Sequence, residues 1–276
     1  ANNDSVITAR LSGATWLDLS AGLNIADITG IADFTSLTQL NCNNNLLTVV
    51  DFSSNTSIQE IYCDNNQIDS INVNGFANLT AITFNGNPLK YLNCANTGLG
   101  FLDFTSSPPL ETLIATGCTN IPDLNITTPT ANLTDLQITG CSGLGYLGCS
   151  LNALPSLDLT GCTSLSNLIC HDNLLTALTI SSCTGLTNLI VHDNLLTSVD
   201  LSANSSLQVL DISDNSLSNI NLSANTSLKD LDFSNNIFSN INLSANSNLE
   251  SLDISINAQL SSLDLRNGNN AILTTF

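Results

Sequence analysis

Apolar residues recur along the chain at a nearly constant spacing. Two neighbouring copies of the pattern place Leu207 against Leu228 and Asn215 against Asn236, 21 residues apart. Twelve such copies, here called coils, begin at residues 14, 37, 58, 79, 99, 121, 144, 165, 186, 207, 228 and 249. Repetition at this period is typical of a solenoid, in which each coil stacks on the next because no single coil can bury its own apolar face.

Each coil has apolar residues at its positions 1, 4 and 6. The alternation at positions 4, 5 and 6 predicts a short strand whose positions 4 and 6 point inward and whose position 5 points outward. The second half of the coil repeats the alternation, as in Val199, Asp200 and Leu201, so a second strand or extended segment should return on the opposite face. A coil of 21 residues leaves no room for a helix of ordinary length.

Asparagine recurs at position 9 of most coils. An inward amide at the bend after a strand can donate to and accept from neighbouring backbones, which satisfies polar groups that the turn would leave unpaired. We therefore predict a structural asparagine ladder made of Asn45, Asn66, Asn87, Asn152, Asn173, Asn194, Asn215, Asn236 and Asn257.

These positions resemble the leucine-rich repeat family over about residues 14–265. The stretch from Leu17 to Leu37 looks like bacterial internalins, and the later units with Cys42 and Cys63 are similar to the cysteine-containing internalin subtype and to secreted repeat proteins of Bacteroidetes-type bacteria. The resemblance implies a right-handed solenoid of about twelve coils, mostly strand and irregular structure, with a parallel β-sheet on its concave face. It also implies a binding role outside the cell or on a bacterial cell surface.

The chain departs from the internalins in lacking a recognisable helical cap, an Ig-like module and a cell-wall anchor, so binding of a specific host receptor is not carried over. We expect the solenoid to span residues 14–270. Residues 1–13 are expected to form an N-terminal flank, and residues 271–276 a truncated last coil or a tail.

The nine cysteines occupy repeat positions rather than a metal-binding motif. No C-x-x-C pair occurs, and side chains on adjacent coils project in the same direction, which strains a disulfide. We favour buried thiols that pack as small apolar groups, with a disulfide or a metal site as the alternatives. The positions are Cys42, Cys63, Cys149 and Cys170 at position 6, Cys94 in a second half-coil, and a ladder of Cys118, Cys141, Cys162 and Cys183.

The outward side of the first strands is the expected functional surface. Both histidines of the chain stack on successive coils, and three aspartates follow them at position 5. The candidate ligand-binding residues are Tyr62, Phe101, Tyr146, Ile169, Ile190, His171, His192, Asp211, Asp232 and Asp253, and the candidate metal ligands are Asp172, Asp193 and Asp214.

The carboxylates and the aromatic residues can each be interpreted in two ways. Stacked carboxylates repel one another, so a cation such as Ca²⁺ would relieve the repulsion. Alternatively, duplication of the repeat has copied solvated aspartates that need no ion, and the glycine-rich calcium-binding nonapeptide is absent. The aromatic residues form either a carbohydrate platform among Asn and Thr or isolated surface rings.

Charge narrows the range of partners. Lys and Arg total 4 against 23 Asp and Glu, a net charge of −19, which argues against nucleic acid and against anionic membranes. No apolar run is long enough to span a bilayer, and no catalytic motif is present. The sequence therefore predicts a non-catalytic module that binds protein or polysaccharide. The alternatives are a glycan-targeting part of a secreted polysaccharide-degrading system and a cation-stabilised spacer, and an open solenoid end could form a homodimer.

Overall fold

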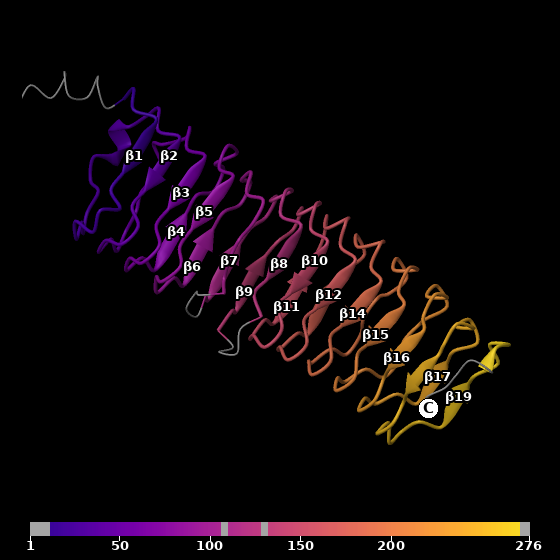
Figure 1. The fold of residues 1–276 in the computed structure, drawn as a ribbon. Coiled ribbons are helices and arrows are strands. Elements are labelled where there is room, and N and C mark those ends of the chain that lie inside the picture. Colours follow the sequence, from indigo (N-terminus) through magenta and orange to yellow (C-terminus); the bar gives the residue numbers. More distant parts are fainter. Residues whose placement is uncertain (1–11, 106–109, 128–131, 271–276) are drawn as a thin grey trace, which may run out of the picture. The chain divides into compact units, whose positions relative to one another are not determined.

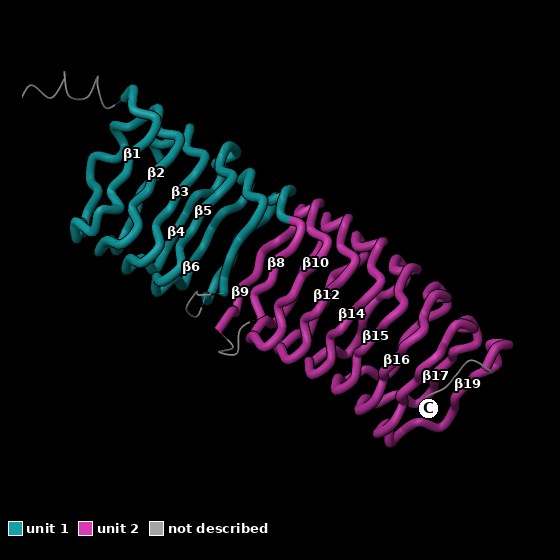
Figure 2. The backbone as a smooth tube through the Cα atoms, in the orientation of Figure 1, with its two compact units in different colours: residues 1–121 teal, residues 122–276 magenta. Residues whose placement is uncertain are grey.

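The computed structural model describes residues 12–105, 110–127 and 132–270. The predicted tail at 271–276 and most of the predicted flank at 1–13 lie outside these ranges. The chain divides into two compact units, residues 1–121 and 122–276, which are considered separately (Figure 2). Almost every element is a three-residue strand (Figure 1).

The first unit carries two parallel sheets on opposite sides of a narrow core. The first strands of successive coils pair rung by rung, and a 3₁₀ turn, η1 (Ile31–Asp33), precedes β2. One sheet contains β1 (Trp16–Asp18), β2 (Gln39–Asn41), β3 (Glu60–Tyr62) and β5 (Ala81–Thr83). The opposite sheet contains β4 (Ser70–Asn72), β6 (Tyr91–Asn93) and β7 (Thr112–Ile114).

The second unit repeats this plan with a longer first sheet of seven parallel strands. That sheet contains β8 (Asp123–Asn125), β10 (Tyr146–Gly148), β12 (Asn167–Ile169), β14 (Asn188–Ile190), β15 (Val209–Asp211), β16 (Asp230–Asp232) and β18 (Ser251–Asp253). The opposite side contains β9 (Asp135–Gln137), β11 (Ser156–Asp158), β13 (Ala177–Thr179), β17 (Asn240–Asn242) and β19 (Ser262–Asp264). We call the outer surface of the seven-stranded sheet the first-strand face, and the opposite side the second-strand face.

Burial along most first strands follows the predicted alternation. In β15 the central Leu210 is 1% exposed, while Val209 and Asp211 on either side remain partly exposed. The parallel β-solenoid predicted from the repeat is therefore confirmed. One detail differs: the coil that begins at Leu99 has no strand at 101–104. In the second half of the coils, some segments form no strand, among them those around Val199 and Ile220.

The asparagine ladder has the predicted structural role. Asn194 is 6% exposed, and its amide Nδ2 donates to the carbonyl oxygens of Cys170, Val191 and His192 at 3.2, 3.1 and 3.0 Å. Its Oδ1 accepts the backbone N–H of Leu175 at 3.0 Å. One side chain thus satisfies four backbone groups and joins its coil to the preceding one.

The nine cysteines are all buried as thiols. In the second half of the coils, Cys162 donates to the carbonyl oxygen of Ile138 at 3.2 Å, and Asn204 at the equivalent position donates to that of Ile180 at 3.1 Å. Cysteine, through its S–H, and asparagine, through its amide N–H, therefore both donate to a carbonyl of the preceding coil. Burial raises the pKa of Cys162 and of Cys183 to about 11, so both stay protonated at neutral pH.

Candidate functional site

The first-strand face of the second unit brings most of the candidate residues together. Strand register places Ile169, Ile190, Asp211, Asp232 and Asp253 directly beside one another on five consecutive strands. Neighbouring parallel strands lie about 4.8 Å apart, so these side chains form one column. Its first two members are apolar and its last three are carboxylates.

The carboxylates are held by the turn that follows each strand. Asp211 Oδ1 accepts the N–H of Ser213 at 3.1 Å and its hydroxyl at 2.7 Å. The equivalent N–H groups of Ser234 and Ser255 donate to Asp232 and Asp253, each at 2.8 Å. The aspartates are therefore oriented before any ligand arrives.

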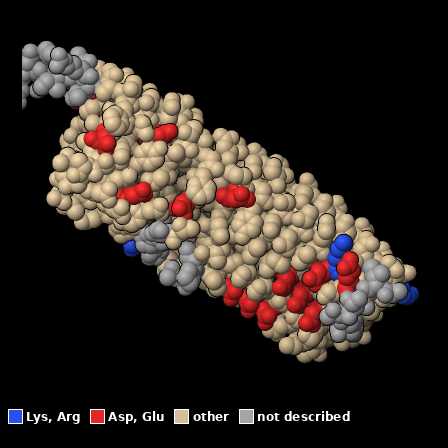
Figure 3. Space-filling view, in the orientation of Figure 1, with Lys and Arg blue, Asp and Glu red and all other residues tan. Residues whose placement is uncertain are grey.

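The surroundings shift the pKa values of the last two carboxylates in opposite directions. Burial raises the pKa of Asp232, and the charges of the neighbouring aspartates add to this effect. Hydrogen bonds from Ser255 lower the pKa of the more exposed Asp253. Acidic side chains gather over the later coils of this unit (Figure 3), where Lys229 and Arg266 are paired with Glu250 and Asp264. The column is thus a site of concentrated negative charge.

A second outward column lies at position 3, of which only Tyr146 was a candidate from the sequence. It contains Tyr146, Asn167, Asn188, Val209 and Asp230, which pair in register beside the first column. The amide of Asn188 donates to Asn167 Oδ1 at 2.9 Å. The signal was present, because a strand that turns position 5 outward must also turn position 3 outward.

Tyr146 lies along its own strand. A Cβ added to Gly148 would come within 2.8 Å of the Tyr146 hydroxyl oxygen, so the glycine leaves room for the ring. The other two aromatic candidates belong to the first unit. Tyr62 donates its hydroxyl to Glu60 at 2.8 Å, and Phe101 is 64% exposed in the coil that lacks a first strand. The structure therefore does not assemble the three rings within one unit.

Asp172, Asp193 and Asp214 lie in the turn directly after the first strands. Their backbone φ angles are 52°, 51° and 50°, a left-handed conformation that Asn and Asp tolerate better than most residues. Asn44 and Asn65 occupy the same position with φ of 57° and 54°. This conformation explains the choice of residue type without an ion.

Asp193 and Asp214 also line an open hollow at these turns. The hollow has a volume of about 360 Å³ and is otherwise bordered by Asn173, Asn194, Leu195, Asn215 and Asn235. Asn235 donates to the carboxylate of Asp214. The structure thus brings these two metal candidates to one place, beside an exposed leucine.

The histidines lie at the same edge. The rings of His171 and His192 are stacked with centroids 4.4 Å apart and an interplanar angle of 8°. Each ring nitrogen Nδ1 lies 2.7 Å from a carboxylate oxygen of the next residue, Asp172 or Asp193. The predicted stacking on successive coils is therefore observed, and the pairing with Asp172 and Asp193 adds to it.

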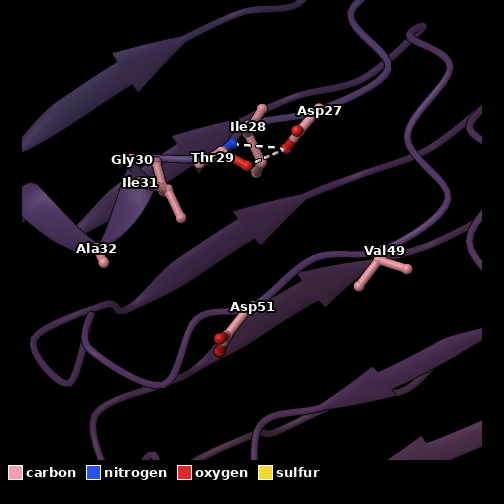
Figure 4. Close-up of a pocket in the computed structure, with 8 residues that line it drawn as sticks. All are labelled: Asp27, Ile28, Thr29, Gly30, Ile31, Ala32, Val49 and Asp51. Carbon is pink, nitrogen blue, oxygen red and sulfur yellow. Dashed lines mark hydrogen bonds between the residues drawn. The ribbon is translucent and has the colours of Figure 1, made fainter.

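A separate pocket of about 280 Å³ lies in the first unit (Figure 4). Asp27 and Asp51 lie on two different segments of its wall, with the apolar side chains of Ile28 and Val49. Asp27 Oδ1 accepts the N–H and the hydroxyl of Thr29 at 2.7 and 2.6 Å, which lowers the pKa of Asp27. The sequence did not single out this pocket, since the same aspartate turn recurs throughout the repeat.

No family model matches the chain, and no curated protein sequence matches it. Among the described residues, no helix has the length and hydropathy needed to cross a membrane. Solved structures do match. The functional domain of InlJ from Listeria monocytogenes, which includes a cysteine ladder, is 28% identical with a TM-score of 0.46; the match covers 96% of this chain and 58% of that one.

Two further structures show the fold. YopM, a leucine-rich effector protein of Yersinia pestis, is 23% identical with a TM-score of 0.51, over 94% of this chain and 72% of that one. The Arabidopsis receptor kinase HAESA was solved with the peptide hormone IDA and the co-receptor SERK1. It is 18% identical with a TM-score of 0.53, and the match covers 85% of this chain and 46% of that one. The chain therefore has the leucine-rich repeat fold, and InlJ, a bacterial internalin, is among the structures to which it is similar.

Proposed function

We propose that this protein is a non-catalytic module that binds a protein partner through the first-strand face of its second unit. The observation that carries the proposal is the register of β12, β14, β15, β16 and β18. It places two isoleucines and three carboxylates in one uninterrupted column. A surface with both features suits an extended segment that carries apolar side chains next to Lys or Arg.

The physical cost of the carboxylate column supports this proposal. Three like charges on adjacent strands repel one another, and Asp232 is additionally desolvated. A cationic partner would relieve that repulsion on binding. HAESA, which has the same fold, is bound to a peptide hormone and a co-receptor, so the fold is compatible with protein recognition. We place this activity outside the cell or at a bacterial cell surface, as the resemblance seen in the sequence implies.

A random peptide library displayed on phage tests the partner chemistry. We expect selection on the whole protein to enrich peptides that combine Lys or Arg with apolar residues. One enriched peptide is then titrated into the triple variant Asp211→Asn, Asp232→Asn and Asp253→Asn. Binding should weaken at least tenfold, and the wild-type affinity should fall steeply with added salt.

The second-strand face supplies a control with the same change of charge. The control is a triple variant that also removes three carboxylates: Asp158→Asn, Asp200→Asn and Asp264→Asn. The turns accept asparagine at this position, because Asn221 and Asn242 already occupy it in other coils. This control should bind like the wild type. Equal losses in both triple variants would contradict the proposal, since they would indicate an effect of net charge alone.

A glycan array examines the alternative partner class. Binding of a polysaccharide that is lost in Tyr146→Ala but kept in the Asp211, Asp232 and Asp253 triple variant would replace the proposed protein partner by a glycan. We expect no such binding, because Tyr146 is the one aromatic candidate in the second unit and lies beside the column of isoleucines and carboxylates.

A further inference from the structure

His171 and His192 form the one group in the described chain that brings imidazoles and a carboxylate within reach of a common ion. One ligand atom from each of His171, Asp172 and His192 can be chosen so that all three lie within 4.8 Å of one another. The rings are parallel, and their side chains are 26% and 25% exposed, so an ion can reach them from solvent.

We propose that His171, His192 and Asp172 bind a divalent transition-metal ion, with Zn²⁺ and Ni²⁺ as the expected occupants. Two imidazole nitrogens favour these metals over Ca²⁺, which prefers oxygen ligands throughout. The ion replaces the hydrogen bond between His171 Nδ1 and Asp172 Oδ2, which lie 2.7 Å apart. Where Nδ1 binds the ion, the neutral imidazole carries its proton on Nε2.

Binding requires the rings to turn as well as the ligand atoms to approach, because an imidazole nitrogen binds a metal in its ring plane and the two planes are nearly parallel. A tetrahedral zinc ion with bonds of about 2.1 Å holds its ligand atoms about 3.4 Å apart. The widest spacing in the group is within 4.8 Å, so rotation of partly exposed side chains has to close it by roughly one ångström. Asp193, whose Oδ2 lies 2.7 Å from His192 Nδ1, supplies a further oxygen at the same edge.

The repeat itself shows that the fold does not require these histidines. Ser213, Ser234 and Ser255 occupy the same position in the next three coils. The carboxylate of Asp172 is equally dispensable for the turn, because Asn44 and Asn65 adopt the same left-handed conformation there. Substitutions to Ser and to Asn are therefore matched to residues that the chain already uses at these positions.

The experiment is isothermal titration calorimetry of the untagged full chain with ZnCl₂, NiCl₂ and CaCl₂. We expect one Zn²⁺ or Ni²⁺ per chain and no heat of binding with CaCl₂. His171→Ser and His192→Ser should each weaken Zn²⁺ binding at least tenfold, and Asp172→Asn several-fold. Asp200→Asn, which removes a carboxylate from the second-strand face, should leave it unchanged.

Two outcomes would overturn the proposal. One is the absence of Zn²⁺ and Ni²⁺ binding to the wild type. The other is equal Zn²⁺ affinity in the wild type and both serine variants, which would assign the metal to the thiols, since these variants keep all nine cysteines. Thermal melting of each variant checks that its fold is retained. The result does not depend on the peptide-binding face, because its carboxylates remain in every variant.

Discussion

Asp232 shows at the scale of one residue how the proposed binding surface conflicts with stability. Burial raises the pKa of Asp232 in the folded chain, with the carboxylates of Asp211 and Asp253 on either side. A raised pKa means that the ionised form is disfavoured by folding. The full cost is present above the raised pKa and disappears as the pH falls through it towards the unfolded value, near 4.

Asp232→Asn should therefore stabilise the protein at pH 7. The amide oxygen can still accept the Ser234 N–H, as Asn41 does in the equivalent turn with Asn43. We expect the free energy of unfolding to rise by about half a kcal/mol, because solvent screens part of the repulsion. Urea unfolding at pH 7 and pH 3 measures this, and the gain should vanish at pH 3.

Asp253→Asn is the matched control for that measurement. Hydrogen bonds from Ser255 lower the pKa of Asp253, so its carboxylate contributes stability above the unfolded pKa and loses it on acidification. This variant should be slightly destabilised at pH 7. Stabilisation of both variants by the same amount would mean that total charge, not the position in the column, decides the effect.

At the scale of the structural element, the turn after the first strand constrains the sequence most strongly. Its second residue has a left-handed backbone in coil after coil, and most coils place Asn, Asp or Gly there. Among the described residues, two of other types also adopt it: Leu151 has φ of 59° and Ile256 has φ of 55°. A β-branched residue in this region is strained by about 1 kcal/mol or more.

Ile256→Asn should relieve that strain. Because Ile256 is 72% exposed, little apolar burial is lost. We expect the free energy of unfolding to rise by about 1 kcal/mol, measured by urea denaturation. The reciprocal change Asn235→Ile introduces the strain and removes a hydrogen bond to Asp214, so it should destabilise the chain by at least as much. A neutral or destabilising result for Ile256→Asn would argue against backbone strain at this turn.

The elements predicted from the repeat are those in which side-chain burial decides the backbone. The buried residues Leu210 and Ile212 predicted β15, because apolar residues at alternate positions specify the inward face of a strand. Burial alone does not decide the second half-coil: Val199 and Leu178 lie at comparable positions, yet only Leu178 lies in a strand. Strand assignment there depends on backbone hydrogen bonds that the side-chain pattern does not encode.

The candidate site was predictable in its columns but not in its contacts. Register follows from the repeat, so Asp211, Asp232 and Asp253 could be placed side by side from the sequence. The pairing of His171 with Asp172 depends on side-chain rotamers, which periodicity does not determine. The left-handed turn had a visible signal, the recurrence of Asn, Asp and Gly at one position, but from the sequence only a metal site or duplicated solvated aspartates were considered there.

At the scale of the whole molecule, the charge of −19 has a consequence for every condition of measurement. Carboxylates that outnumber Lys and Arg repel one another, and salt screens this repulsion. We expect the melting temperature to rise by several degrees between 10 and 500 mM NaCl, roughly the range over which the Debye length falls from about 30 to below 10 Å.

Calcium chloride at matched ionic strength is the control. If the carboxylates are simply solvated, CaCl₂ should give the same melting temperature as NaCl. An additional rise with CaCl₂ alone would contradict that expectation and would support the cation-stabilised spacer suggested as an alternative by the sequence. Differential scanning fluorimetry in both salt series provides the measurement.

The asparagine ladder has a direction. Every described hydrogen-bond partner of the Asn194 side chain, from the Cys170 carbonyl to the Leu175 N–H, precedes it in the chain, and the same is true of the Asn66 and Asn257 side chains. A coil can therefore complete these bonds as soon as it has been synthesised, before the following coil exists. Growth from the ribosome, or export through a channel starting with the N-terminus, lets each new coil dock on a finished template.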